Sequence, residues 1–235
     1  MNPIEQKFAR LATDHAPGQE VRQTAGAFDA HLRGEALPGR PVDFSHGDVN
    51  DDAFPPTPGA LDEFIAGVHR GGSQAYTEYR GDAHLREHVA ARLADFTGRP
   101  VSAATELIIT PGTQGALFLA LGATVTAGDK VAIVRPDYFA NRKIVEFLGA
   151  HPVPVRMDYL AADDNAGLDL EELEQAFKSG TRTFLFSNPN NPTGAIYSPA
   201  ELSRIADLAD RYGATVIVDQ LYSRMLFRGQ TFTHL

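Results

Sequence analysis

Cysteine is absent from this chain of 235 residues, so disulfide bonds, thiolate metal sites and cysteine nucleophiles are excluded. No apolar run is long enough to cross a bilayer, and the opening residues, MNPIEQK, lack the basic and then apolar order of a secretory signal. The formal net charge of −9 would repel nucleic acid and anionic membranes. We therefore expect a cytoplasmic protein with no nucleic-acid or membrane partner.

Lysine is scarce, and the chain contains four: Lys7, Lys130, Lys143 and Lys178. Lys7 lies in an N-terminal arm, and Lys130 begins an expected strand. The other two lie on or just beyond expected helices, so we interpret them as solvated surface charges. None of the four is expected at the carboxyl edge of a sheet, where open α/β folds bind ligands.

Apolar runs and helical patterns alternate along most of the chain, beyond a Pro/Gly-rich junction at residues 51–59. Buried strands are predicted at residues 106–110, 131–134, 152–156, 183–186 and 215–218. Helices are predicted at residues 20–32, 61–69, 84–96, 115–125, 139–148, 170–177 and 199–212. This order predicts an α/β fold with a doubly wound, mostly parallel sheet.

Residues 183–194, TFLFSNPNNPTG, run from an apolar strand into a turn with three asparagines, two prolines and a glycine. A plain turn needs one or two such residues. We interpret the turn as a rigid holder for a side chain at the carboxyl end of a strand.

Other strand ends would meet this turn at the same edge. Residues 110–115 lead straight into a helix whose free N–H groups could seat a phosphate, although alone they fit an ordinary strand–helix turn. Tyr138 could stack on a flat cofactor or pack at the rim. Asp219 directly follows a buried strand, and it could cap the next turn, bind a metal or pair with a protonated ring nitrogen.

The motifs at these strand ends resemble those of a known family. The asparagine turn reads Asn-Pro-x-Asn-Pro-Thr-Gly, and Asp219 and Tyr222 form an Asp-x-x-Tyr pair. From about residue 40 onward the sequence resembles the class I/II aminotransferases, which are fold-type-I enzymes that use pyridoxal 5′-phosphate. The resemblance implies amino-group transfer between an amino acid and a 2-oxo acid.

The resemblance also implies roles for individual residues. Asn191 and Tyr222 would hydrogen-bond the phenolic O3′ of the cofactor, Asp219 would pair with its pyridinium nitrogen, and Tyr138 would lie over its ring. The phosphate would be held by Gly112, Thr113 and Gln114.

Two further positions match the family more loosely. Tyr76 corresponds to a tyrosine that in relatives reaches the phosphate of the neighbouring subunit, which implies a homodimer. Gly47 lies where relatives carry a segment beside the substrate. In this interpretation, residues 1–57 form an N-terminal arm and part of a small domain, and residues 58–235 form an incomplete, PLP-transferase-like large domain that binds the cofactor.

The Schiff-base lysine of the family would follow the Asp-x-x-Tyr motif by a few dozen residues, and none of the four lysines matches it. Two strands that fill the middle of the sheet in relatives would also lie beyond Leu235. We therefore expect the 235-residue chain alone to be inactive and to fold poorly.

Alternative functions remain open at this point. The quoted motifs would hold the cofactor, but they do not determine which bond of the substrate is broken. A β-lyase or decarboxylase reaction is therefore one alternative. A non-catalytic, aminotransferase-like binding module is another. His84 and His88 flank Glu87 in a His-x-x-Glu-His pattern that zinc peptidases share, but a solvated helix is the favoured interpretation.

Overall fold

The computed structural model describes residues 3–11, 55–70, 76–160 and 165–235. The helix predicted at residues 20–32 and the candidate Gly47 lie outside the described residues, as does most of the predicted N-terminal segment 1–57.

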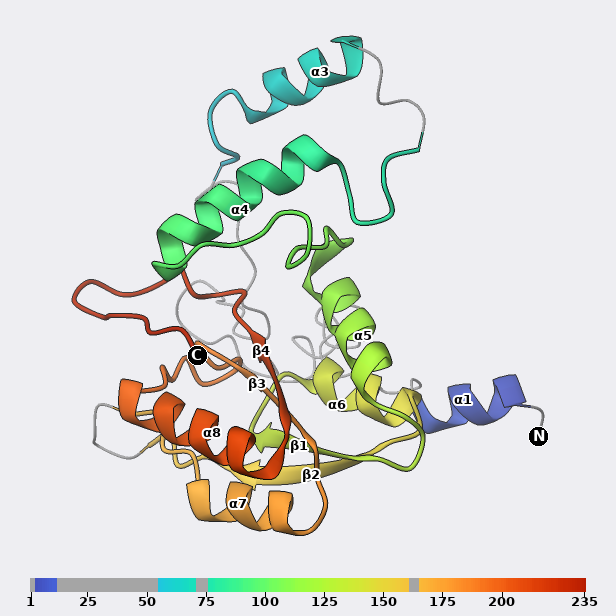
Figure 1. Ribbon diagram of the computed structural model, residues 1–235, viewed down its shortest axis with the longest axis vertical. Coiled ribbons are helices and arrows are strands. Elements are labelled where there is room, and N and C mark those ends of the chain that lie inside the picture. The colour runs from blue at the N-terminus through green and yellow to red at the C-terminus, as the bar shows by residue number, and fades with distance from the viewer. Residues whose placement is uncertain (1–2, 12–54, 71–75, 161–164) are drawn as a thin grey trace, which may run out of the picture.

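A parallel sheet forms the centre of the described chain (Figure 1). Its strands are β1 (Lys130–Arg135), β2 (His151–Arg156), β3 (Thr183–Ser187) and β4 (Thr215–Asp219), in the spatial order β2-β1-β3-β4. Every ladder between neighbouring strands is parallel. The doubly wound α/β fold predicted from the sequence is confirmed.

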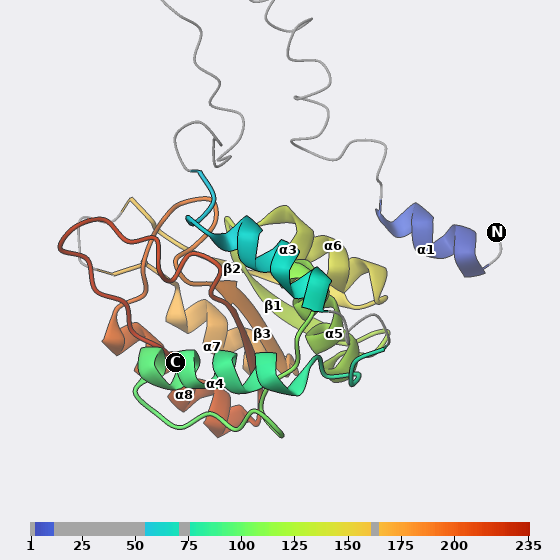
Figure 2. The ribbon, with the colours of Figure 1, turned by 90° about the horizontal axis from the view of Figure 1, so that it is seen from above.

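Helices cover both faces of this sheet (Figures 1 and 2). Helices α5 (Gly112–Thr124) and α6 (Phe139–Phe147) lie on one face, and α7 (Leu170–Lys178) and α8 (Pro199–Tyr212) lie on the other. Alternate residues of each strand point to opposite faces, so each face has its own core. On β3, Leu185 packs on the α5/α6 side, whereas Phe184 and Phe186 pack on the α7/α8 side.

Helices α7 and α8 begin where their capping residues predict. The Asp169 side chain accepts a hydrogen bond from the Glu172 N–H at 2.9 Å. Ser198 and Glu201 form a full capping box, with proline at the first helical position. Gly213 ends α8 in the left-handed conformation, at φ +59°.

The prediction of a strand at residues 106–110 is wrong, and within the described ranges the sheet has four strands rather than five. This segment joins no ladder, and Ile108 is 57% exposed. Its Ile109 N–H bonds to the carbonyl oxygen of Arg80 instead of to a strand. An apolar run becomes a strand only beside a partner, and the described residues place no strand next to it.

Two more helices, α3 (Ala60–Arg70) and α4 (Ala83–Thr97), lie at the end of the molecule away from α7 (Figure 1). The last residues of the chain pack against α4. Phe96 stacks on Phe232, its carbonyl oxygen contacts the His234 ring, and the Arg224 guanidinium lies 4.3 Å from its ring centroid. The short helix α1 (Pro3–Leu11) contacts α6, where the Lys7 ammonium lies 5.3 Å from the Phe147 ring.

No helix among the described residues is both long and apolar enough to span a bilayer.

Candidate active site

The carboxyl ends of β3 and β4 lie side by side. Ser187 and Asp219 are register partners at the last position of the two strands. Beyond them, the Asn188 N–H donates to the carbonyl oxygen of Asp219 at 2.9 Å. The asparagine turn and the Asp-x-x-Tyr motif therefore leave the sheet at one point, as predicted.

Asn190 organises the asparagine turn. Its buried Oδ1 accepts hydrogen bonds from the Thr193 hydroxyl at 2.7 Å and from the Thr193 N–H at 3.2 Å. Its Nδ2 donates to the carbonyl oxygen of Pro136, beyond the end of β1, at 3.3 Å. Gly194, at φ +75°, donates its N–H to the Asn190 carbonyl oxygen and closes the turn. The unusual composition of the turn thus builds a fixed loop that is tied to the neighbouring strand.

Asn191 is held through its backbone. Its N–H donates to the Ser187 hydroxyl at 3.0 Å, and Ser187 is the register partner of Asp219. One hydroxyl therefore connects the turn that carries Asn191 to the strand end that carries Asp219.

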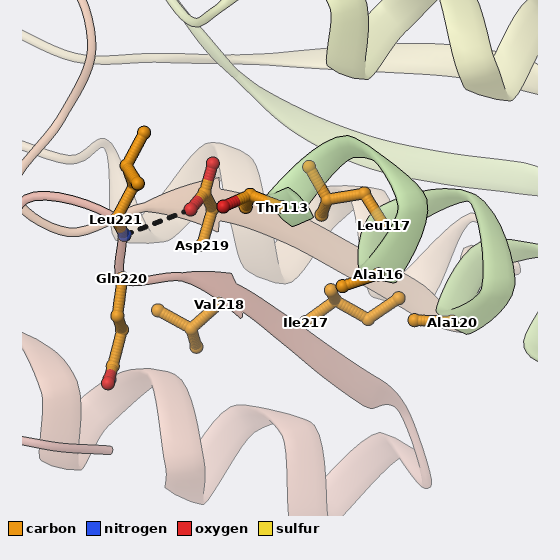
Figure 3. A pocket seen from close by; sticks show the side chains of 9 residues that line it. All are labelled: Thr113, Ala116, Leu117, Ala120, Ile217, Val218, Asp219, Gln220 and Leu221. Atoms are coloured by element: carbon orange, nitrogen blue, oxygen red, sulfur yellow. Dashed lines mark hydrogen bonds between the residues drawn. The ribbon is translucent and has the colours of Figure 1, made fainter. Parts of the chain in front are cut away.

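Asp219 borders a hollow of about 380 Å³ between β4 and α5 (Figure 3). Its Oδ1 accepts a hydrogen bond from the Leu221 N–H at 3.1 Å. Burial raises the pKa of this half-buried carboxyl group, and the Leu221 hydrogen bond opposes the shift. The hollow is apolar along Leu117 and Ile217 and becomes polar at Asp219 and Thr113.

The first turn of α5 supplies the donors at this polar end. Gly112 begins the helix at φ +73°, and no side chain caps it. The Gly112 N–H donates to the Thr110 carbonyl oxygen at 2.8 Å, so the N–H groups of the next residues and the helix dipole are what favour an anion there. Gln114 Nε2 donates to the Tyr138 hydroxyl at 2.9 Å, so this turn also holds the predicted aromatic ring.

The sequence interpretation missed Asp137, which lies two residues beyond the end of β1 and directly before Tyr138. Asp137 Oδ2 accepts from Asn141 Nδ2 at 2.8 Å, and its Oδ1 accepts from the Ser187 hydroxyl at 3.1 Å. Burial raises the pKa of Asp137 to about 6 despite these hydrogen bonds, and the nearby charge of Asp219 adds to the shift. The available signal was a weaker form of the one that identified Asp219, namely a carboxylate within two residues of the end of a buried strand.

Within the described chain, two predicted cofactor residues make no side-chain hydrogen bond or ring contact with the others. Tyr76 is fully exposed. Tyr222 lies half-buried on the turn after β4, and its carbonyl oxygen accepts from the Met225 N–H.

The two histidines on α4, His84 and His88, contact groups of their own helix. His88 Nδ1 contacts the carbonyl oxygen of His84 at 2.7 Å, whereas His84 Nδ1 lies 3.6 Å from the Glu87 carboxylate. Across the described parts of the chain, no group of three or more histidine, aspartate or glutamate side chains could hold a metal ion. The favoured interpretation as a surface helix fits these contacts.

Residues 40–235 match the family description "Aminotransferase class I and II". The chain belongs to this family. Class I/II aminotransferases are enzymes, and the match covers the whole sheet together with every strand end described above.

The chain is also similar to individual curated aminotransferases. The aspartate aminotransferase of Sulfolobus acidocaldarius is 33% identical over 160 residues, which cover 68% of this chain and 40% of that protein. Human kynurenine–oxoglutarate transaminase 1 is 29% identical over 184 residues, which cover 75% of this chain and 44% of that protein. The chain thus spans less than half the length of these curated relatives.

A solved structure, an aspartate aminotransferase from Rhodobacter sphaeroides, is 60% identical and superposes with a TM-score of 0.84. The superposition covers 98% of this chain and 55% of that chain.

The four lysines of this aminotransferase chain all have partners away from Asp219. Lys130 donates to the Ser179 carbonyl oxygen, at the amino end of the sheet. Lys143 pairs with Glu146, and Lys178 pairs with Glu174. The pairs formed by Lys143 and Lys178 agree with the interpretation of these two lysines as surface charges, and Lys7 contacts the Phe147 ring.

Pyridoxal phosphate fits the groups at this edge. The cofactor has an anionic phosphate, a flat ring and a ring nitrogen that can carry a proton. The uncapped first turn of α5 suits the phosphate, the Tyr138 ring suits the flat face, and Asp219 suits the protonated nitrogen.

Proposed function

We propose that the protein transfers amino groups between an amino acid and a 2-oxo acid with pyridoxal 5′-phosphate as its cofactor. One observation carries the proposal most directly. The Asn191 turn and Asp219 leave adjacent parallel strands at a shared point, and the first turn of α5 borders the same hollow as Asp219.

Each residue at this edge has a role that its chemistry can perform. Asp219 would pair with the pyridine nitrogen, and Asn191 and Tyr222 would donate to the phenolic oxygen. Tyr138 would cover the ring. Three residues at the start of α5 would hold the phosphate: Gly112, Thr113 and Gln114. When bound, the cofactor supplies an electron sink for the α-carbon of the substrate.

The raised pKa of Asp219 supports its pairing with a cation. Burial disfavours the charged carboxylate when nothing offsets its charge. A protonated nitrogen beside it would stabilise the carboxylate, and the carboxylate would in turn keep that nitrogen protonated. Asp219 would therefore hold a proton at the ring nitrogen, which strengthens the electron sink.

The proposed substrate pair includes aspartate as amino donor, because two of the similar proteins are named aspartate aminotransferases. We also propose that the working protein is a cytoplasmic homodimer in which Tyr76 reaches the neighbouring subunit. Its full exposure leaves the phenol available for that contact. Gly47 stays a candidate substrate residue on the resemblance alone.

An assay of the protein expressed from its complete gene tests this function. With pyridoxal phosphate and 2-oxoglutarate, we expect amino transfer from aspartate or from another member of a panel of amino donors. Asp219→Asn should lower kcat/KM by about a hundredfold or more, because the amide cannot offset a ring cation. Asp210→Asn on the exposed side of α8 is the matched control and should leave kcat/KM unchanged.

Two results would contradict the proposal. One is the absence of amino transfer with every donor, and the other is full activity of Asp219→Asn. Elimination or decarboxylation products in place of a new amino acid would favour the alternative reactions of the same cofactor.

A further inference from the structure

Ser187 lies between three polar groups at the carboxyl edge of the sheet. Its hydroxyl donates to Asp137 Oδ1 at 3.1 Å and accepts the Asn191 N–H at 3.0 Å. Asn190 Nδ2 approaches the same hydroxyl at 3.4 Å. A serine hydroxyl has one proton to donate. Asp137 accepts this hydrogen bond from Ser187, so the lone pairs of the Ser187 oxygen face the turn.

Asp137 is itself held from the other side. Asn141 is fully buried in the first turn of α6, and its Nδ2 donates to Asp137 Oδ2 at 2.8 Å. The carboxylate therefore joins the start of α6 to the end of β3. Tyr138, the proposed ring-covering residue, lies between Asp137 and Asn141 in the sequence.

From these contacts we infer that Asp137 is a positioning residue, which acts through the Ser187 hydroxyl to fix the turn that presents Asn191 to the cofactor. The inference rests on the proposed function, because it assigns Asp137 a role in holding a cofactor contact. Asp137 does not itself touch the ring in this account. It sets the place of the Asn191 amide and, through Asn141, the direction in which Tyr138 enters α6.

A second explanation of Asp137 would be electrostatic, because its charge lies near enough to Asp219 to affect it. The Asn141 side chain allows the two explanations to be separated. Asn141 Oδ1 is buried and has no hydrogen-bond partner among the described residues. In Asp137→Asn, the new amide can accept from Ser187 and donate to Asn141 Oδ1 once the Asn141 amide turns over. This variant keeps the positioning contacts and removes the charge.

The test measures pyridoxal phosphate binding by variants of the protein expressed from its complete gene. Fluorescence titration gives the dissociation constant, and circular dichroism in the cofactor absorption band reports the orientation of the ring. Asp137→Ala and Ser187→Ala should each raise the dissociation constant roughly tenfold and reduce the dichroic band. The double variant should bind about as weakly as either single variant, because both changes break one chain of contacts.

Asp137→Asn should stay within about threefold of the wild type and keep the dichroic band. Asp210→Asn on α8 is the matched surface control. The inference is overturned if Asp137→Asn binds as weakly as Asp137→Ala, because charge would then be the cause. It is also overturned if the two alanine effects multiply to about a hundredfold, or if neither variant changes binding.

The wild type separates this inference from the proposed function. If the wild-type protein binds no pyridoxal phosphate, the proposed function fails and the inference fails with it. If the wild type binds pyridoxal phosphate and Asp219→Asn weakens this binding, but Asp137→Ala does not, the inference fails while the proposed function stands.

Discussion

The carboxyl group of Asp137 makes the stability of the fold depend on pH. Its pKa is about 6 in the folded protein, against a reference value of 3.8. Between these pH values the folded state binds more protons than the unfolded state. The contribution of Asp137 to the free energy of unfolding therefore falls as pH rises from about 4 to about 6, by up to about 3 kcal/mol.

Asp137→Asn removes this titrating group, so the variant should lack this part of the pH dependence of stability. Other carboxyl groups titrate over the same range, so the informative quantity is the difference between wild type and variant. The stability of the wild type relative to Asp137→Asn should decline between pH 4 and pH 6.5 and then level off. Chemical denaturation of both proteins without cofactor measures this difference, and a difference independent of pH would refute the raised pKa.

At the level of single residues, the sequence suggested most of the proposed site residues and missed the residues that support them. Asp219 and Asn191 could be found because each ends or follows an apolar strand in a recognisable spacing. Asp137 and Ser187 were passed over because their roles depend on a contact between segments 50 residues apart. Such a contact is set by the order of strands in the sheet, which the sequence does not state.

Among the elements, α8 has a role beyond covering the sheet. Glu201 is buried, and its carboxylate accepts hydrogen bonds from the N–H groups of Ala166 at 2.9 Å and Gly167 at 3.0 Å. The same carboxylate accepts the Ser198 N–H at 2.8 Å to complete the capping box. One side chain thus fixes the start of α8 and the segment that leads into α7.

Glu201→Ala should therefore destabilise the protein by about 3 kcal/mol, because several buried N–H groups lose their acceptor at once. The matched control is Glu171→Ala, which removes an exposed glutamate from the first turn of α7 and should cost less than about 1 kcal/mol. Thermal or denaturant unfolding compares the two variants. Equal losses would show that the contacts with the segment before α7 contribute nothing.

Helices and strands were predicted best where capping residues or a continuous apolar run mark an element that is also buried in the fold. The limits of α8 follow from Ser198 and Gly213, and each described strand that was found carries a continuous apolar run. The failure at residues 106–110 has the opposite cause. Their apolar character is that of a strand, but a strand also needs a hydrogen-bonded neighbour, which pattern alone cannot supply.

At the scale of the whole molecule, the fold brings distant segments to one edge of a parallel sheet. The residues after β1, the asparagine turn and the residues after β4 lie there because parallel strands share one carboxyl edge. The start of α5 lies at the same edge because this helix packs against β4. The α7/α8 layer and the α5/α6 layer each bury one face of that sheet and hold the strand ends in register. The sequence predicted this convergence, and the register of Ser187 with Asp219 is its structural basis.

A crystal structure of the protein, expressed from its complete gene and bound to pyridoxal phosphate, tests the central claim most directly. The account predicts a hydrogen bond between the Asp219 carboxylate and the pyridine nitrogen, with the phosphate at the first turn of α5 and the Asn191 amide at the phenolic oxygen. A cofactor bound elsewhere, or one whose ring nitrogen faces away from Asp219, would contradict it.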